Sequence, residues 1–384
     1  MESANIKTKF RTLNLNSGKS MRLFWMTTFL IFCATFFTLG SKQAISAAGN
    51  MKWHPGHYLM LVNPGDSNPL YMEQIYSELA VSAFRGVVIR YTWPELEPQK
   101  DVYDFSAIEN HLTELASRNK QLIVLLETKS FNLTKEIVPD YIKTTPIYEG
   151  GIFPIGAYGS KITKGYNIKM WNSYIQGRLR ALIRNMGQHF DIHPNFEGFG
   201  LTETAMGTPI EPLTTSQTDA FYGNLMILNQ RMRYRFPNTM TFQFVNYPRS
   251  ILETYVNSLQ TMGSALGAPD VFPDEPGLNF PGSQYSPRGL YTYYPERAGL
   301  MPLAIQIEEP NYLNTRLDGT GHQPSIGELL TFARDTLKVN YLFWTRTPEY
   351  YTKVLNTMKA PKQKSDLYGG LSPVCPANYT SCIE

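Results

Sequence analysis

Cysteine is scarce in this chain, which has three in 384 residues, and the first of them, Cys33, lies within an apolar N-terminal stretch. The other two, Cys375 and Cys382, lie close together at the C-terminal end. No neighbouring histidine or further cysteine completes a set of zinc ligands, which disfavours a zinc site. In an oxidising compartment we expect this pair to form a disulfide that holds the C-terminal tail.

A surplus of positive charge is also lacking once the N-terminal segment is set aside. The whole chain has a net charge of +3, but residues 1–48 contain six of its 35 basic residues and one of its 32 acidic residues. The remainder holds 29 basic and 31 acidic residues, a net charge of −2. This balance gives no indication of nucleic acid or of an anionic membrane surface as a partner.

The N-terminal segment has the pattern of a secretory signal. Several basic residues precede an apolar run from Leu23 to Leu39, and the small residues Ser46 and Ala48 follow it. We therefore expect a signal peptide over residues 1–48 and an exported protein, periplasmic or extracellular, without stable membrane association after cleavage. An uncleaved anchor is the alternative, and Met21 is an alternative start.

The rest of the chain alternates short apolar segments with amphipathic ones, a pattern typical of repeated βα units and a parallel sheet. Strands are expected at 57–62, 86–90, 121–126, 198–202, 241–245, 268–272, 302–307 and 339–344. Helices are expected at 70–83, 106–119, 171–189, 218–236, 251–266, 325–337 and 350–358. No glycine-rich phosphate turn follows the first strand, which disfavours a doubly wound sheet. The pattern predicts one (β/α)8 barrel domain over residues 49–360 and a tail over 361–384.

Two connections are longer than the rest. They run over residues 128–170 and 273–301, after the third and sixth predicted strands. In a barrel of this type the active site lies at the C-terminal ends of the strands, so both loops are expected to overhang it. Long loops in this place are typical walls of a substrate site.

Acidic residues end two strands on opposite sides of the predicted barrel. The fourth strand leads into Glu203, and the seventh leads into Glu308 and Glu309. Two carboxyl groups across one barrel mouth suit the cleavage of a glycosidic bond. One protonates the leaving oxygen, and the other attacks the anomeric carbon or activates water.

The region of the second strand carries a further motif. Residues 86–98 read GVVIRYTWPELEP, and Tyr-Asp-Phe follows at 103–105. This resembles the retaining (β/α)8-barrel glycoside hydrolase superfamily, of the clan A type, over most of residues 55–355. The resemblance implies a glycosidase with Glu203 as acid/base, a strand-seven glutamate as nucleophile, and Arg90 as the group that orients it. It also implies an aromatic residue at the end of strand eight, where Trp344 lies.

The sequence departs from that superfamily at one place, since Thr202 stands where an asparagine usually precedes the acid/base. The glutamate of strand seven is chosen by alternation: Ile305 and Ile307 are expected to face the helices and Gln306 the interior, which selects Glu308 as nucleophile and leaves Glu309 in reserve. Stacking walls for sugar rings are expected from the aromatic residues Trp93, Trp171, Tyr247 and Trp344, for which packing in the core is the alternative.

Other functions compete with this hypothesis. A non-catalytic carbohydrate-binding barrel is the first alternative, because Thr202 replaces the usual asparagine. A metal-dependent barrel hydrolase is the second, but the segment His54–His57 precedes the first strand and His189 with His193 lacks the glutamate of a zinc-protease helix. Under the working hypothesis the protein needs no cofactor and no metal, and its binding partner is a carbohydrate substrate. The sugar, the linkage, endo or exo action and the oligomeric state stay open.

Overall fold

A computed structural model of the protein describes residues 50–62, 69–157 and 159–384. The expected signal peptide lies outside the described residues. Among those residues, no helix is both long and apolar enough to cross a membrane.

Eight parallel strands close into a barrel, as the sequence predicts, and each pairs with the next barrel strand along the chain. In chain order they are β2 (Gly56–Leu61), β3 (Phe84–Thr92), β4 (Gln121–Glu127), β8 (Phe196–Leu201), β10 (Met240–Phe244), β11 (Ala265–Ala268), β12 (Leu303–Ile307) and β13 (Tyr341–Thr345).

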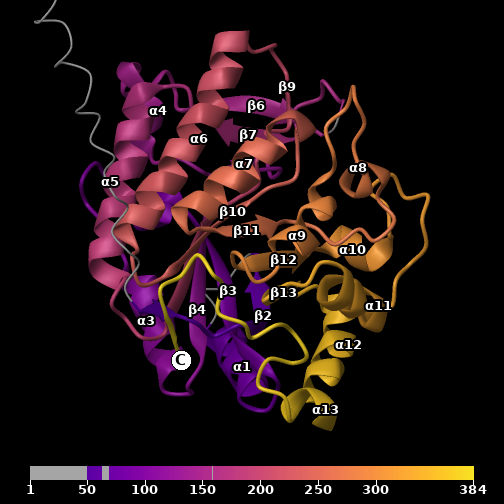
Figure 1. Ribbon diagram of the computed structural model, residues 1–384. Coiled ribbons are helices and arrows are strands. Elements are labelled where there is room, and N and C mark those ends of the chain that lie inside the picture. The colour runs from indigo at the N-terminus through magenta and orange to yellow at the C-terminus, as the bar shows by residue number, and fades with distance from the viewer. Residues whose placement is uncertain (1–49, 63–68, 158) are drawn as a thin grey trace, which may run out of the picture. The chain divides into compact units, whose positions relative to one another are not determined.

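Helices surround these strands (Figure 1). They are α1 (Pro69–Ala80), α3 (Ser106–Ala116), α5 (Ser173–Phe190), α6 (Thr215–Arg235), α7 (Arg249–Met262), α11 (Ile326–Thr331), which continues as the π-helical turn η3 (Phe332–Thr336), and α12 (Pro348–Lys359). Behind β11 the chain forms short pieces instead of one long helix: α8 (Pro276–Asn279), η2 (Leu290–Thr292) and α9 (Tyr294–Arg297).

The position predicted for the sixth strand is wrong. It was expected over residues 268–272, but β11 ends at Ala268, and α7 ends at Met262 where the pattern predicted a helix to 266. The segment Ala-Leu-Gly-Ala has few of the β-branched or aromatic residues that mark strands, so its position is weakly encoded. The strand ends four residues earlier than expected, at Ala268 instead of residue 272, so Asp270 lies just beyond the strand instead of within it.

The long connection after β4 folds into a small antiparallel sheet. Its strands pair in the order β5 (Lys129–Ser130), β7 (Gly165–Ile168), β6 (Ile152–Gly156) and β9 (Thr208–Pro209). The last of these comes from the connection after β8. The Asn167 side chain also donates to the Met206 carbonyl at 3.0 Å. The two connections are therefore joined above the barrel mouth, with α4 (Asp140–Thr144) and η1 (Pro146–Tyr148) between β5 and β6.

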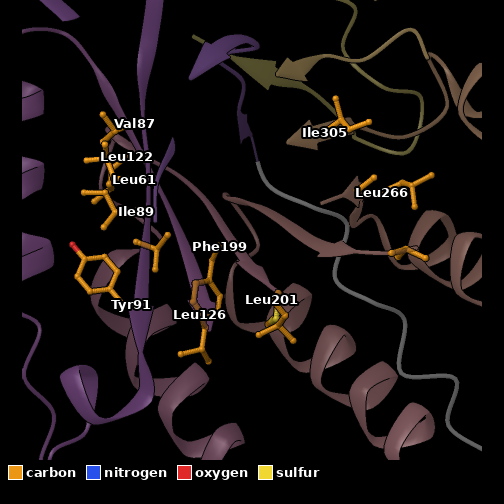
Figure 2. Close-up of a cluster of buried hydrophobic side chains, with 14 of the residues drawn as sticks. Leu61, Val87, Ile89, Tyr91, Leu122, Leu126, Phe199, Leu201, Leu266 and Ile305 are labelled. Carbon is orange, nitrogen blue, oxygen red and sulfur yellow. The ribbon is translucent and has the colours of Figure 1, made fainter. Parts of the chain in front are cut away.

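Side chains on the barrel strands alternate between two cores. One set points outward against the helices, and Figure 2 shows members of it, including Ile89, Leu126 and Ile305. The other set fills the barrel interior, including Val88, Phe242 and Phe343. This two-residue alternation is the expected geometry of a closed parallel barrel.

A small residue on β8 makes room for this interior. A Cβ added to Gly200 would lie 2.2 Å from the Phe242 ring. The ring therefore occupies the space that a side chain at position 200 would need, and the interior is packed without a pore.

The two ends of the described chain pack together at the end of the barrel opposite the mouth. β1 (Met51–Lys52) pairs in parallel with β14 (Cys382–Ile383). Cys375 and Cys382 form a disulfide, in agreement with the sequence prediction, and α13 (Pro361–Lys364) begins the tail. Beside this closure the buried Glu197 carboxylate binds the His54 ring at 2.7 Å and accepts a hydrogen bond from Tyr341 at 2.6 Å.

We expect Gly200→Ala to lower the free energy of unfolding by about 1–3 kcal/mol, because the added methyl group overpacks the interior against Phe242. Gly223→Ala on α6 is the matched control: no atom lies within 4 Å of its added Cβ, and alanine favours the helix by about 0.5–1 kcal/mol. Urea unfolding measures both. Equal stability of the two variants would contradict this packing.

Candidate active site

The carboxyl ends of the strands surround a cavity of about 710 Å³. It is lined by residues near the carboxyl ends of all eight barrel strands and by the connection after β4. Of the predicted residues, Glu203, Glu308, Arg90, Thr202 and Glu309 all line this cavity. The structure thus brings together the two predicted acids and the predicted arginine.

Glu308 is held by two donors from the barrel interior. Arg90 on β3 contacts Glu308 Oε1 through Nη2 at 2.5 Å, forming an ion pair. Gln306 Nε2 donates to the same oxygen at 2.8 Å and to Thr345 Oγ1 at 3.0 Å. The backbone N–H of Glu308 donates to Asn311 Oδ1 at 2.7 Å, so both ends of the residue are fixed.

Glu203 is held on the opposite side by residues that the sequence reasoning did not select. Lys129 Nζ donates to Glu203 Oε1 at 2.6 Å and to the Ala205 carbonyl, also at 2.6 Å. Asn246, two residues beyond β10, donates from Nδ2 to Glu203 Oε2 at 2.5 Å. Each oxygen of the carboxylate therefore has one protein donor.

Thr202 does not place its hydroxyl as a simple substitute for asparagine. Its Oγ1 is hydrogen-bonded to Thr128 Oγ1 at 2.7 Å and accepts the Thr128 backbone N–H at 3.1 Å. Its carbonyl accepts a hydrogen bond from the Gln243 side chain. Thr202 thus fixes the end of β8 against the end of β4, and an amide beside Glu203 is supplied by Asn246 instead.

Asp270 adds a further carboxyl group to the cavity. It follows β11, and its Oδ1 accepts a hydrogen bond from Asn311 Nδ2 at 3.3 Å. Burial, together with the negative charges of Glu203 and Glu308, raises the pKa of Asp270 to about 8. Near pH 7 this carboxyl group is therefore mostly protonated and adds no negative charge beside Glu203 and Glu308.

Another acid, Glu127, lines the cavity on the side of β4. Glu127 ends that strand, and its Oε2 lies 2.6 Å from Lys135 Nζ. Both residues line the cavity. Together with Arg90–Glu308 and Lys129–Glu203, this makes three cation–carboxylate pairs in one site.

The predicted aromatic walls need correction. Trp93 and Trp344 have no exposed surface. Trp93 donates to Glu97 at 2.8 Å, and Trp344 donates to His57 at 3.0 Å on the helix-facing side of β13. Rings enclosed in this way have no face to offer a sugar.

The other two predicted rings, Trp171 and Tyr247, are partly buried and pack against the helix-facing core. Neither is among the described residues that line the cavity. An aromatic residue that does line it is Phe131, in the connection after β4, whose side chain is 50% exposed. Sequence periodicity offers no signal for such a loop residue.

No family model matches this sequence, and no curated protein matches it. Solved structures do. A β-galactosidase from Bacillus circulans sp. alkalophilus superposes with a TM-score of 0.52 at 10% identity, covering 77% of this chain and 51% of that one. A β-galactosidase from the psychrophilic Marinomonas ef1 has a TM-score of 0.52 at 7% identity, covering 83% and 61%. A cold-adapted β-galactosidase from Rahnella sp. R3 has a TM-score of 0.50 at 11% identity, covering 78% and 51%.

This chain therefore has the barrel fold found in these glycoside hydrolases, as the sequence motifs indicate. It spans about half to three fifths of the length of those three proteins. At such low identity the likeness shows the fold, and the chemistry has to be argued from the site itself.

We compare the stability of Asp270→Asn with that of the parent protein. The difference in favour of the variant is expected to grow as pH rises from about 4 towards 8. In the unfolded chain this acid ionises near its ordinary value of about 3.9, whereas in the folded protein it holds its proton to about 8. The folded state binds more protons between these values, so Asp270 lowers stability as pH increases.

Thermal unfolding of both proteins between pH 4 and pH 9 measures this effect. Asp219→Asn, at an exposed position on α6, is the control and should leave the pH profile of the parent unchanged. A constant difference in unfolding temperature between Asp270→Asn and the parent over this range would contradict the assignment.

Proposed function

We propose that this chain is a glycoside hydrolase that cleaves a β-linked polysaccharide or oligosaccharide with two carboxyl groups. The observation that carries the proposal is the placement of Glu203 and Glu308 after β8 and β12 in one cavity, each fixed by a cation and an amide. Paired carboxyl groups across a sugar site are the chemical requirement for this reaction. The shared fold with three β-galactosidases supports it.

In the proposed reaction Glu308 is the nucleophile. Arg90 and Gln306 both bind its Oε1, which orients the carboxylate and assigns Oε2 as the oxygen that attacks the anomeric carbon. Glu203 enters this step protonated, and it gives its proton to the leaving oxygen as the glycosidic bond breaks. Water then attacks the anomeric carbon, its proton passes to the Glu203 carboxylate, and the ester bond to Glu308 breaks. The two displacements together retain the configuration at the anomeric carbon.

Lys129 and Asn246 position Glu203 for both steps. The protonated carboxyl of Asp270 limits repulsion in the site, because a third negative charge would otherwise lie close to the two acids. The proposed reaction uses no cofactor and no metal.

A binding barrel without catalysis is the second candidate. The hydroxyl of Thr202 is engaged by Thr128, so the residue before Glu203 does not offer the usual contact for a sugar hydroxyl. Such a protein would bind saccharides and release no product. Turnover assays therefore separate the two candidates directly.

We propose export from the cytoplasm as the setting for this activity. The pattern of residues 1–48 supports it, and so does the disulfide, which persists in oxidising compartments.

We expect Glu203→Gln and Glu308→Gln each to lower kcat by about a hundredfold to ten-thousandfold, because each removes a proton donor or a nucleophile and keeps the side-chain shape. Reducing-end release from β-linked polysaccharides measures the loss, and circular dichroism checks the fold. The exposed Glu253→Gln on α7 is the control and keeps parental activity.

If Glu309→Gln abolished turnover while Glu308→Gln retained it, the nucleophile would be the neighbouring residue and the alternation argument for strand seven would be wrong.

The products should retain the anomeric configuration of the substrate. Proton NMR during the first minutes of hydrolysis detects the first anomer released, before mutarotation mixes the two. The initial product of a β-linked substrate is expected to be the β-anomer, which also implies a separation of the two carboxyl groups of about 5–5.5 Å. An initial α-anomer would assign an inverting reaction and remove the covalent role of Glu308.

A further inference from the structure

Arg346 lies in the same cavity and has no role in the reaction proposed above. It directly follows β13 and lines the cavity. Its backbone N–H donates to the Met60 carbonyl of β2 at 3.0 Å, which fixes the chain at this point. The side chain is half-buried.

Arg346 differs from the other cations of the cavity in its ion pairing. Arg90, Lys129 and Lys135 each form an ion pair with a carboxylate of the site, at 2.5 to 2.6 Å. Arg346 forms no ion pair with any acid in residues 50–62, 69–157 and 159–384. Within these residues its positive charge is therefore not neutralised by a salt bridge.

Two aromatic rings hold the guanidinium of Arg346. It lies 4.9 Å from the ring centre of Tyr71 on α1 and 4.6 Å from that of Tyr351 on α12. Tyr351 is itself fixed, because its hydroxyl donates to Glu78 at 2.5 Å. Stacking on the tyrosine rings restrains the planar group, and the Tyr351 hydroxyl also forms a hydrogen bond with part of its N–H edge. The Nε atom is buried and has no hydrogen-bond partner among the described residues.

We propose that Arg346 binds an anionic group on the saccharide, so that the substrate of this cavity is an acidic sugar polymer. A planar guanidinium forms two parallel charge-assisted hydrogen bonds with a carboxylate, as in a uronic acid, and similar bonds with a sulfate ester. A hydroxyl group of a neutral sugar offers a single, uncharged acceptor. This inference rests on the proposed function, since it takes the cavity to be a saccharide site.

The test uses sugar polymers that differ only at carbon 6. One series is a β-1,4-glucan oligosaccharide, its β-1,4-glucuronan counterpart and its 6-sulfated form; the second is the corresponding β-1,4-mannan series. Binding of each to the parent protein is measured by calorimetry at low temperature, at about 20 mM and about 500 mM salt. The same titrations are made with Arg346→Gln, with Arg346→Lys, and with Arg180→Gln, a change at an exposed arginine on α5.

The expected result is that an acidic member binds about tenfold to a hundredfold more tightly than its neutral counterpart. Arg346→Gln removes this preference, Arg346→Lys keeps part of it, and Arg180→Gln leaves it unchanged. Preference for the carboxylated form identifies a uronic acid as the ligand, and preference for the sulfated form identifies a sulfate ester.

Three results would overturn the inference: equal or tighter binding of neutral members, no binding of any acidic member, or an acidic preference that persists in Arg346→Gln. Cleavage is scored separately. Cleavage of a neutral member with no acidic preference contradicts the role of Arg346 and leaves the glycosidase proposal intact. Binding of an acidic member that depends on Arg346, without cleavage in either series, supports the anion site and counts against the glycosidase.

Discussion

Side chains alternate between the interior and the helices along each strand of the closed parallel barrel, and this alternation determines which residues of the chain come together at the mouth. On β3 the interior residue Val88 is followed two positions later by Arg90, which emerges at the mouth. On β12 the same step leads from Ala304 through Gln306 to Glu308. Because all eight strands run in the same direction, these steps end at one place, and residues more than 200 positions apart form the Arg90–Glu308 pair.

Charge pairing in a confined space follows from this convergence. Acids that end neighbouring strands would repel one another, and the structure meets this in two ways. Cations from the strands and from the connection after β4 bind Glu308, Glu203 and Glu127. Asp270 holds its proton to about pH 8. The other three cations among the described residues of the cavity are engaged with acids, and the proposed substrate would supply the negative charge for Arg346.

The sequence allowed much of this to be predicted, and the errors have physical causes. Apolar alternation placed seven of the eight strands and put the sixth too late, and the parity of Ile305 and Ile307 put Glu308 at the cavity. The same parity on β13 turns Phe343 inward and Trp344 towards the helices, so the superfamily resemblance misled where alternation did not.

Other parts of the site could not be read from periodicity. Asp270 was missed because the weak strand β11 ends earlier than its composition suggests. Lys129 reaches Glu203 through β5, a strand that exists only because the connection after β4 folds into its own sheet. Such a contact depends on pairing between distant segments, and it carries no local pattern.

If Glu308 attacks the sugar, a covalent glycosyl-enzyme forms on this residue, and trapping that intermediate tests the proposed mechanism. The protein is treated with 2-deoxy-2-fluoro β-glycosides of the gluco, galacto and manno series, including their uronic acids, each with an activated leaving group. The digest is then sequenced by mass spectrometry. One sugar per chain is expected, attached to Glu308. Attachment to Glu309 or Asp270, or an unlabelled protein that still hydrolyses the parent glycosides, would contradict it.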